Sequence, residues 1–161
     1  LALDAVAIAA QALVGRLLGA GDTVGARAAT RRMLELGLVF GVLVGLALLG
    51  SRGLLPHAFS DDPLVLHLAS FVLLFAAVLQ PVNAVVFVLD GVLMGAGDTR
   101  YLAVTMVAAA VLFLVLAAVL IVTGAGLGWL WASIGALMLV RLATLTSRLR
   151  SDRWLVTGAI R

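Results

Sequence analysis

Two polar side chains interrupt the first apolar segment of the sequence, at a spacing that puts both on one side of a helix. Asp4 and Gln11 are seven residues apart, close to two helical turns. Asp4 precedes the end of the segment at Leu18 by fourteen residues, which is about 21 Å of helix rise. A carboxyl group so deep in lipid is costly and usually faces a cavity or a partner. We therefore predict a proton or cation site at Asp4. The alternatives are a carboxyl held by a neighbouring helix, or one near the outer headgroups.

A second polar stripe runs through the third apolar segment. Its members are Gln80, Asn83 and Asp90, of which the last two are seven residues apart. Pro81 lacks the amide hydrogen that would bond one turn back, so we expect the helix to bend there and to free a backbone carbonyl. A bent helix lined with amides is one way to build a binding site near the membrane midplane.

Structural roles are the alternative for this second stripe. Asp90 lies near one end of its segment, where the carboxylate can pair with Arg100 or Arg16. We favour this structural or gating role for Asp90. Gln80 and Asn83 lie nearer the middle, where amides form helix–helix hydrogen bonds at least as often as they bind a substrate.

Enzymatic and metal chemistry finds no support in the sequence. His57 and His67 have no partner at ligand spacing, and cysteine is absent, which excludes thiolate metal sites and disulfides. The glycine-rich segment Gly91–Gly97 lacks the Lys-Ser/Thr pair and the preceding strand of a phosphate-binding loop. We expect no catalytic residue, no metal site and no organic cofactor.

The composition places these residues in a membrane protein. Hydrophobic residues make up 64% of the 161-residue chain and charged residues 12%, and the mean hydropathy is +1.23. A soluble domain is about 45–50% apolar and about 25% charged, so lipid must be the solvent on most faces of this chain. The eleven basic residues are all arginine, scattered at helix ends without the interleaved aromatics of a nucleic-acid-binding surface. A soluble fold and a nucleic-acid partner are excluded.

Five apolar stretches are each long enough to span the hydrocarbon core, which takes about 20 helical residues. They cover residues 1–18, 33–50, 64–94, 101–123 and 127–147. The runs are rich in Ala and Leu and do not alternate, which argues against strands. The sequence begins inside the first stretch without a Met, so we interpret it as a piece of a longer all-α integral membrane protein.

Local signals refine these helices. Arg31 and Glu35 stand four apart, which predicts an amphipathic helical start to the second helix. Asp61 or Asp62 can cap the third helix, whose first turn tolerates Pro63. We further expect a packing seam of small residues in the second helix and an aromatic belt at both membrane interfaces. The seam consists of Gly37, Gly41 and Gly45, and the belt of Trp129, Trp131 and Trp154.

The arginine distribution predicts the orientation in the membrane. With five alternating spans, the first loop, the third loop and the C-terminal tail share one side, which carries ten arginines against Arg52 alone on the other. This bias favours a cytoplasmic C-terminus in a multi-pass protein of the plasma membrane. The ten are Arg16, Arg27, Arg31, Arg32, Arg100, Arg141, Arg148, Arg150, Arg153 and Arg161.

One short motif occurs twice. Gly19-Ala20-Gly21-Asp22-Thr23 recurs 76 residues later as Gly95-Ala96-Gly97-Asp98-Thr99, directly before Arg100. Both copies follow a helix that runs toward the arginine-rich side. Glycine can end such a helix in the left-handed conformation, and Asp or Thr can start the next. The repeat indicates a duplicated unit, although five identical residues can also arise by chance.

These motifs resemble a known family of transporters. Residues 4–22 (DAVAIAAQALVGRLLGAGD) resemble the second helix of a lobe in the multidrug and toxic compound extrusion (MATE) family. Residues 80–101 (QPVNAVVFVLDGVLMGAGDTRY) resemble the fourth helix and the following loop. The tail at residues 148–158 is similar to the C-terminus of the DinF-type branch.

The resemblance implies helices eight to twelve of a twelve-helix protein, most of the second of two six-helix lobes. Such proteins export cationic, amphipathic compounds in exchange for protons or sodium by rocking their lobes. The implied partners are the lipid bilayer, small organic cations and the missing first lobe, which carries the coupling carboxylate in DinF-like members. Sodium-coupled relatives place an acid near the position of Asn83, which cannot titrate, so a second-lobe cation site is in doubt here.

Two other functions remain open at this point. A lipid-linked precursor flippase of the same superfamily would carry more spans and a basic central cavity. A membrane scaffold without transport activity would confine its polar residues to helix ends, which Asp4, Gln11, Gln80 and Asn83 do not favour.

Overall fold

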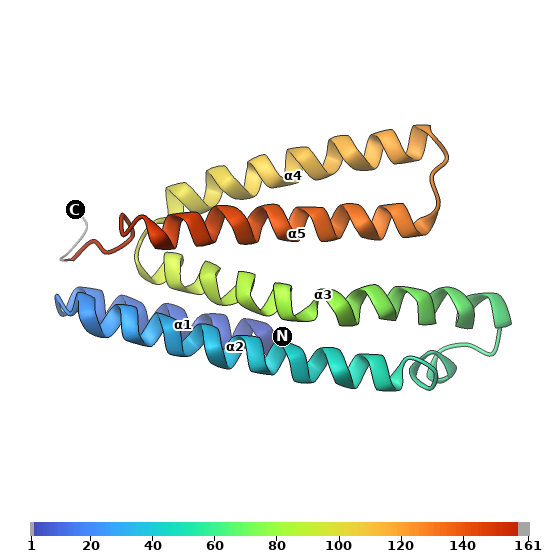
Figure 1. The fold of residues 1–161 in the computed structure, drawn as a ribbon, viewed down its shortest axis with the longest axis horizontal. Helices are drawn as coiled ribbons and strands as arrows, with labels where there is room; N and C mark the ends of the chain where they lie inside the picture. Colours follow the sequence, from blue (N-terminus) through green and yellow to red (C-terminus); the bar gives the residue numbers. More distant parts are fainter. Residues whose placement is uncertain (1, 158–161) are drawn as a thin grey trace.

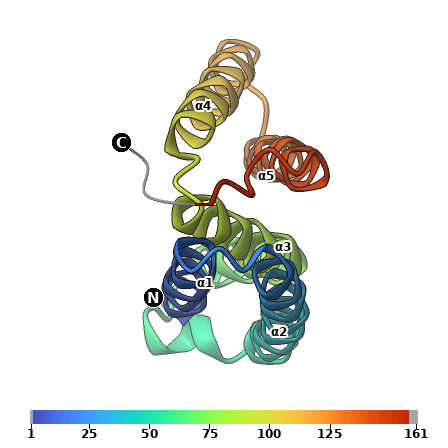
Figure 2. The same cartoon turned by 90° about the vertical axis from the view of Figure 1, so that its left-hand side faces the viewer.

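The computed structural model describes residues 2–157 and is a bundle of long helices (Figure 1). Leu1 and residues 158–161, Arg161 among them, lie outside the described residues. Helices α1, α2 and α3 pack together, and α4 and α5 form a hairpin whose α5 lies against α3 (Figure 2). The elements are α1 (Ala2–Gly19), α2 (Thr23–Ser51), the 3₁₀ helix η1 (Leu55–Ala58), α3 (Pro63–Gly95), α4 (Thr99–Val122) and α5 (Leu127–Arg150).

The helix boundaries follow the local signals, with one extension. Helix α2 begins at Thr23, ten residues before the predicted apolar stretch, because the Asp22 side chain accepts a hydrogen bond from the Gly25 amide at 2.7 Å. Gly21 and Gly97 have φ values of 79° and 75°, the left-handed conformation expected where each motif ends a helix. Asp62 caps α3 through the Leu64 amide at 2.8 Å, as one of the two predicted alternatives.

Glycines allow α2 to approach α3 closely. A Cβ atom at Gly41 would lie 2.6 Å from Cβ of Ala84 and 2.9 Å from the carbonyl oxygen of Gln80. At Gly45 it would lie 2.7 Å from the carbonyl oxygen of Ala77. Ala77 is the residue whose carbonyl Pro81 leaves without its helical hydrogen bond, so the seam brings the α2 backbone to that carbonyl. The predicted packing seam is confirmed.

Helix α1 contacts another side of α3 in the same way. Gly91 and Gly95 lie against the carbonyl oxygens of Ala7 and Gln11, so close that a side chain at either glycine would collide with the α1 backbone. This register places Asp4 nearly level with Val88 of α3. From there to Gly95 is about 11 Å of helix rise, and the Asp4 residue is half-buried.

The outer faces of the bundle are apolar and exposed. Val104 and Val107 of α4 are each 62% exposed, which in a membrane means contact with lipid or with further protein. By length and composition, α2, α3, α4 and α5 are the four described helices that can cross a membrane, and the 18-residue α1 lies beside them. Trp154 is the exception to the predicted aromatic belt: it is 2% exposed, and its indole nitrogen donates to the Leu149 carbonyl at 3.0 Å.

Candidate functional site

The structure brings Asp4, Gln11 and Asp90 together. The three line a pocket of about 310 Å³ between α1 and α3, with Phe87 and Met94 on its apolar side. Gly91 and Ala7 form its floor, because their small size lets the two helices approach. A carboxyl group, an amide and a second carboxylate thus converge from two helices, which is an arrangement that can bind a proton or a cation.

Asp90 is held in this pocket by an arginine that the sequence analysis did not select. Nη2 of Arg141 on α5 donates to both carboxylate oxygens of Asp90, at 2.8 and 2.6 Å. The two side chains are only 12% and 15% exposed. The expected partners, Arg100 and Arg16, were therefore wrong. A signal was present in the sequence, since Arg141 is the one charged residue within the apolar stretch 127–147.

The Asp90–Arg141 pair gives the two carboxylates of the pocket different environments. Arg141 neutralises Asp90 and ties α3 to α5. A paired carboxylate in a medium of low dielectric constant is held in place, because separating the charges would leave both uncompensated. The pair therefore fits the structural or gating role predicted for Asp90, and the proton or cation site at Asp4 stays a prediction.

Asn83 extends this polar stripe toward the middle of the bundle. It lies one turn beyond Phe87 and two turns beyond Asp90 on α3. Its Oδ1 atom is buried and accepts no hydrogen bond from the described residues, so it is available as an acceptor. Gln80 lies elsewhere, with its backbone against Gly41 of α2. The pocket that Asp4, Gln11 and Asp90 line therefore includes neither Gln80 nor Asn83.

The two repeated motifs have diverged in what their carboxylates contact. Asp22 caps α2, whereas Asp98, at the start of α4, makes no capping hydrogen bond. Asp98 instead accepts from Nε and Nη2 of Arg148 at 2.5 and 3.1 Å. The Arg148 guanidinium also lies over the Tyr101 ring, 4.8 Å from its centroid, and the Tyr101 hydroxyl donates to the Thr144 carbonyl. The second motif is thus a clamp between α4 and α5.

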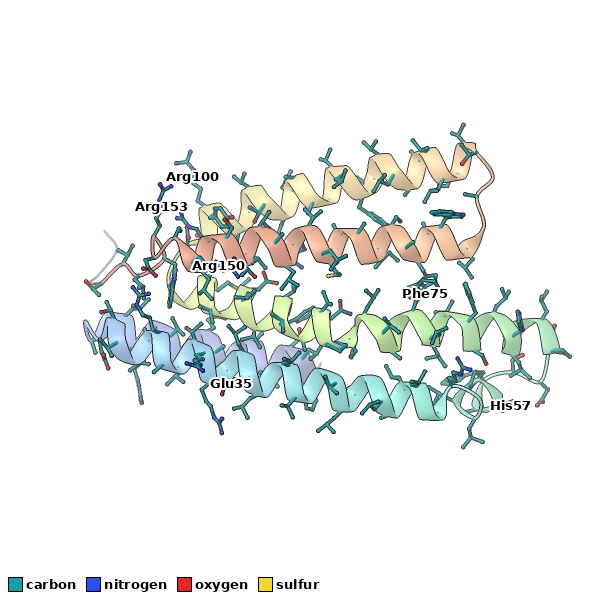
Figure 3. All side chains as sticks on the ribbon, viewed as in Figure 1. Glu35, His57, Phe75, Arg100, Arg150 and Arg153 are labelled. Carbon is teal, nitrogen blue, oxygen red and sulfur yellow. The ribbon has the colours of Figure 1, made fainter. Side chains whose placement is uncertain are left out.

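The arginine-rich end of the bundle also fixes the tail. Nη1 of Arg27 donates to Asp152 at 2.5 Å, and this hydrogen bond, with the nearby positive charge, lowers the pKa of the Asp152 carboxyl. Figure 3 shows Arg100, Arg150 and Arg153 at this end, and His57 at the other. The remaining motif residue, Gly19, ends α1.

Comparison with known proteins places this arrangement among transporters. The family model MatE matches residues 2–119 of the chain. DETOXIFICATION 42 and DETOXIFICATION 43 of Arabidopsis thaliana are 36% and 34% identical to it over 140 and 146 residues. These alignments cover 87% and 91% of this chain but 27% and 28% of the two plant proteins. The chain therefore spans little more than a quarter of the length of these curated relatives.

More distant similarities agree with this result. The probable multidrug resistance protein NorM of Haemophilus ducreyi is 32% identical over 93 residues, which is 58% of this chain and 20% of that protein. The crystal structure of the eukaryotic MATE transporter AtDTX14 superposes with a TM-score of 0.85 at 24% identity. It covers 95% of this chain and 35% of the transporter chain, so the bundle has the fold of part of that structure.

Proposed function

Since the chain belongs to the MATE family of membrane transporters, we propose that it supplies most of the second lobe of a drug exporter driven by a proton or sodium gradient. On this proposal the present helices are the eighth to the twelfth of twelve, and the first lobe completes the substrate cavity. We further propose that the protein belongs to the DinF-type branch of this family. The arginine-rich end faces the cytoplasm of a plasma-membrane protein.

One observation carries the proposal: Asp4, Gln11 and Asp90 share a pocket inside an otherwise apolar bundle. Polar groups that only held helices together would not need an open volume beside them. Asp4 releases its proton on one side of the membrane and takes it up on the other, and its negative charge attracts a cationic substrate in the deprotonated state. Asp90 stays paired with Arg141 and keeps α3 and α5 moving as one body during the rocking of the lobes.

The pocket also fits the two proposed ions differently. A proton needs only one carboxyl group, which Asp4 provides. A sodium ion needs several oxygen ligands. Besides Asp4, the pocket offers the Gln11 amide and the Asp90 carboxylate, and Arg141 already holds both oxygens of Asp90. We therefore favour the proton as the coupling ion.

The test uses the full-length protein in proteoliposomes loaded with a fluorescent lipophilic cation. An imposed proton gradient is expected to drive dye movement, and Asp4→Asn is expected to abolish it. Asp61→Asn is the matched control, because Asp61 is exposed in the connection before α3. No dye movement under a proton or a sodium gradient, with folded protein confirmed, would refute the exporter proposal. Full transport by Asp4→Asn would show that the Asp4 carboxyl group takes no part in the transport cycle.

A further inference from the structure

A second, larger pocket lies at the arginine-rich end of the bundle. It is an open pocket with a volume of about 720 Å³, lined by residues of α2, α3, α5 and the start of the tail. None of the transport candidates lines it, so it is separate from the site between α1 and α3. Its volume is within the range of about 300–1,000 Å³ that is usual for small-molecule sites.

The rim of this pocket carries excess positive charge. Arg27, Arg31 and Arg150 line it, together with Glu35 and Asp152. Asp152 is paired with Arg27, and Glu35 is shared between Arg31 and Arg32 at 3.2 Å each. Arg150 has no carboxylate partner in the described part of the chain. Figure 3 shows Arg150 on α5 and Glu35 on α2 at the same end of the bundle.

Away from the rim the pocket is apolar. Leu34 and Leu38 lie one and two turns after Arg31 along α2. Val85 and Leu89 line the pocket from α3. Leu38 is 45% exposed, so the apolar part of the pocket opens to the outside of the bundle. The pocket is therefore charged at its rim and apolar below the rim.

The wall of the pocket also holds an unpartnered hydroxyl group. Thr30 is 3% exposed, and its Oγ1 has no hydrogen-bond partner. A threonine in a helix usually donates to the carbonyl one turn back. Among the described residues only Thr30 and Asn83 have a buried side-chain oxygen without such a bond. A polar ligand at the rim would satisfy the Thr30 hydroxyl.

We propose that this pocket binds an anionic phospholipid from the leaflet at the arginine-rich end. Its phosphate group lies between Arg150 and Arg31, near Thr30, and one acyl chain follows Leu34 and Leu38. The guanidinium groups match phosphate in charge and geometry. A basic pocket between helices, next to an anionic membrane surface, is where such a lipid is attracted. Binding would fasten α2 to α5 and so couple the conformation of this lobe to membrane composition.

The test uses the full-length protein in nanodiscs of phosphatidylglycerol and phosphatidylcholine in equal amounts. A photoreactive Leu38→benzoylphenylalanine side chain is expected to crosslink to phosphatidylglycerol in preference to phosphatidylcholine. Arg150→Gln removes the charge-assisted hydrogen bonds of this guanidinium to the phosphate and is expected to reduce the preference about ten-fold. The control variant is Arg153→Gln, which removes an arginine that does not line the pocket at the same end.

The controls separate this proposal from its competitors. A benzoylphenylalanine at Leu46, which is 59% exposed on α2 and lies outside the pocket, reports unselective lipid contact. Equal crosslinking of both lipids from position 38 would overturn the proposal, as would a preference that Arg150→Gln leaves intact. Crosslinking to another part of the protein would overturn it too, because the pocket would then be a contact between lobes. Equal effects of Arg150→Gln and Arg153→Gln would also overturn the proposal, because they would show that general surface charge attracts the lipid.

Discussion

The glycine seam between α2 and α3 supports a quantitative prediction for Gly41→Ala. The new Cβ atom would lie 2.6 Å from Cβ of Ala84 and 3.1 Å from Cα of Pro81. Carbon atoms prefer separations of about 3.5–4.0 Å, so the helices would have to move apart by roughly 1 Å at this point. The colliding atoms belong to backbone and to a Cβ, and none of them can rotate away.

Forcing this separation is expected to destabilise the protein by about 1–3 kcal/mol, the usual cost of overpacking. The control is Gly50→Ala in the same helix, where a Cβ meets nothing within 4 Å. That variant should be neutral or stabilised by up to about 1 kcal/mol, because alanine is the better helix former.

Equilibrium unfolding in detergent micelles, followed by far-ultraviolet circular dichroism, measures both variants against the parent. The difference between the two variants isolates the seam from the helix propensity of alanine, since the residue change is the same. Equal stabilities for Gly41→Ala and Gly50→Ala would refute the close approach of α2 and α3 described above. A loss of stability in Gly50→Ala without one in Gly41→Ala would refute the assignment of open space beside Gly50.

Two further predictions concern charged pairs. Arg141→Met should cost about 3 kcal/mol, because it leaves the Asp90 carboxylate buried without its partner, whereas Arg141→Met combined with Asp90→Leu should recover most of that loss in the same unfolding measurement. At the tail, Arg27 lowers the pKa of Asp152 below that in the unfolded chain, so the pair stabilises the fold above the ordinary aspartate range and is lost as pH falls through the lowered value. The protection factor of the amides near Trp154, which is corrected for the intrinsic exchange rate at each pH, should therefore stay high at neutral pH and fall only in acid. Asp152→Asn should lower it at neutral pH, and an unchanged protection factor in that variant would contradict the role of the pair.

The predicted helices were set largely by solvent. A run of about 20 apolar residues has to be helical in lipid, since no water is present to satisfy its backbone groups. This is why the five helices could be predicted. The cap of α3 was predicted as Asp61 or Asp62, and the structure selects Asp62. The ten-residue extension of α2 back to Thr23 was predicted only in part, because polar helical turns carry no hydropathy signal.

Contacts between helices were harder to predict. The Gly37, Gly41 and Gly45 seam was visible because close backbone approach requires small residues at a helical spacing. Partners of charged residues were not visible in this way. From the sequence, Asp90 could pair with Arg16 or Arg100, and only the register and rotation of the packed helices bring Arg141 to it.

The sequence by itself therefore determined the solvent, the number and direction of the helices and the family likeness, all of which depend on local composition, periodicity and motif spacing. The tertiary structure alone decided which polar residues of different helices meet: Asp90 with Asp4 and Gln11, and Asp98 with Arg148. It also decided that Trp154 packs in the core. The physical reason is that hydropathy fixes the depth of a residue in the membrane. Its neighbours depend on helix rotation and register, and those are set by the close packing of many small contacts.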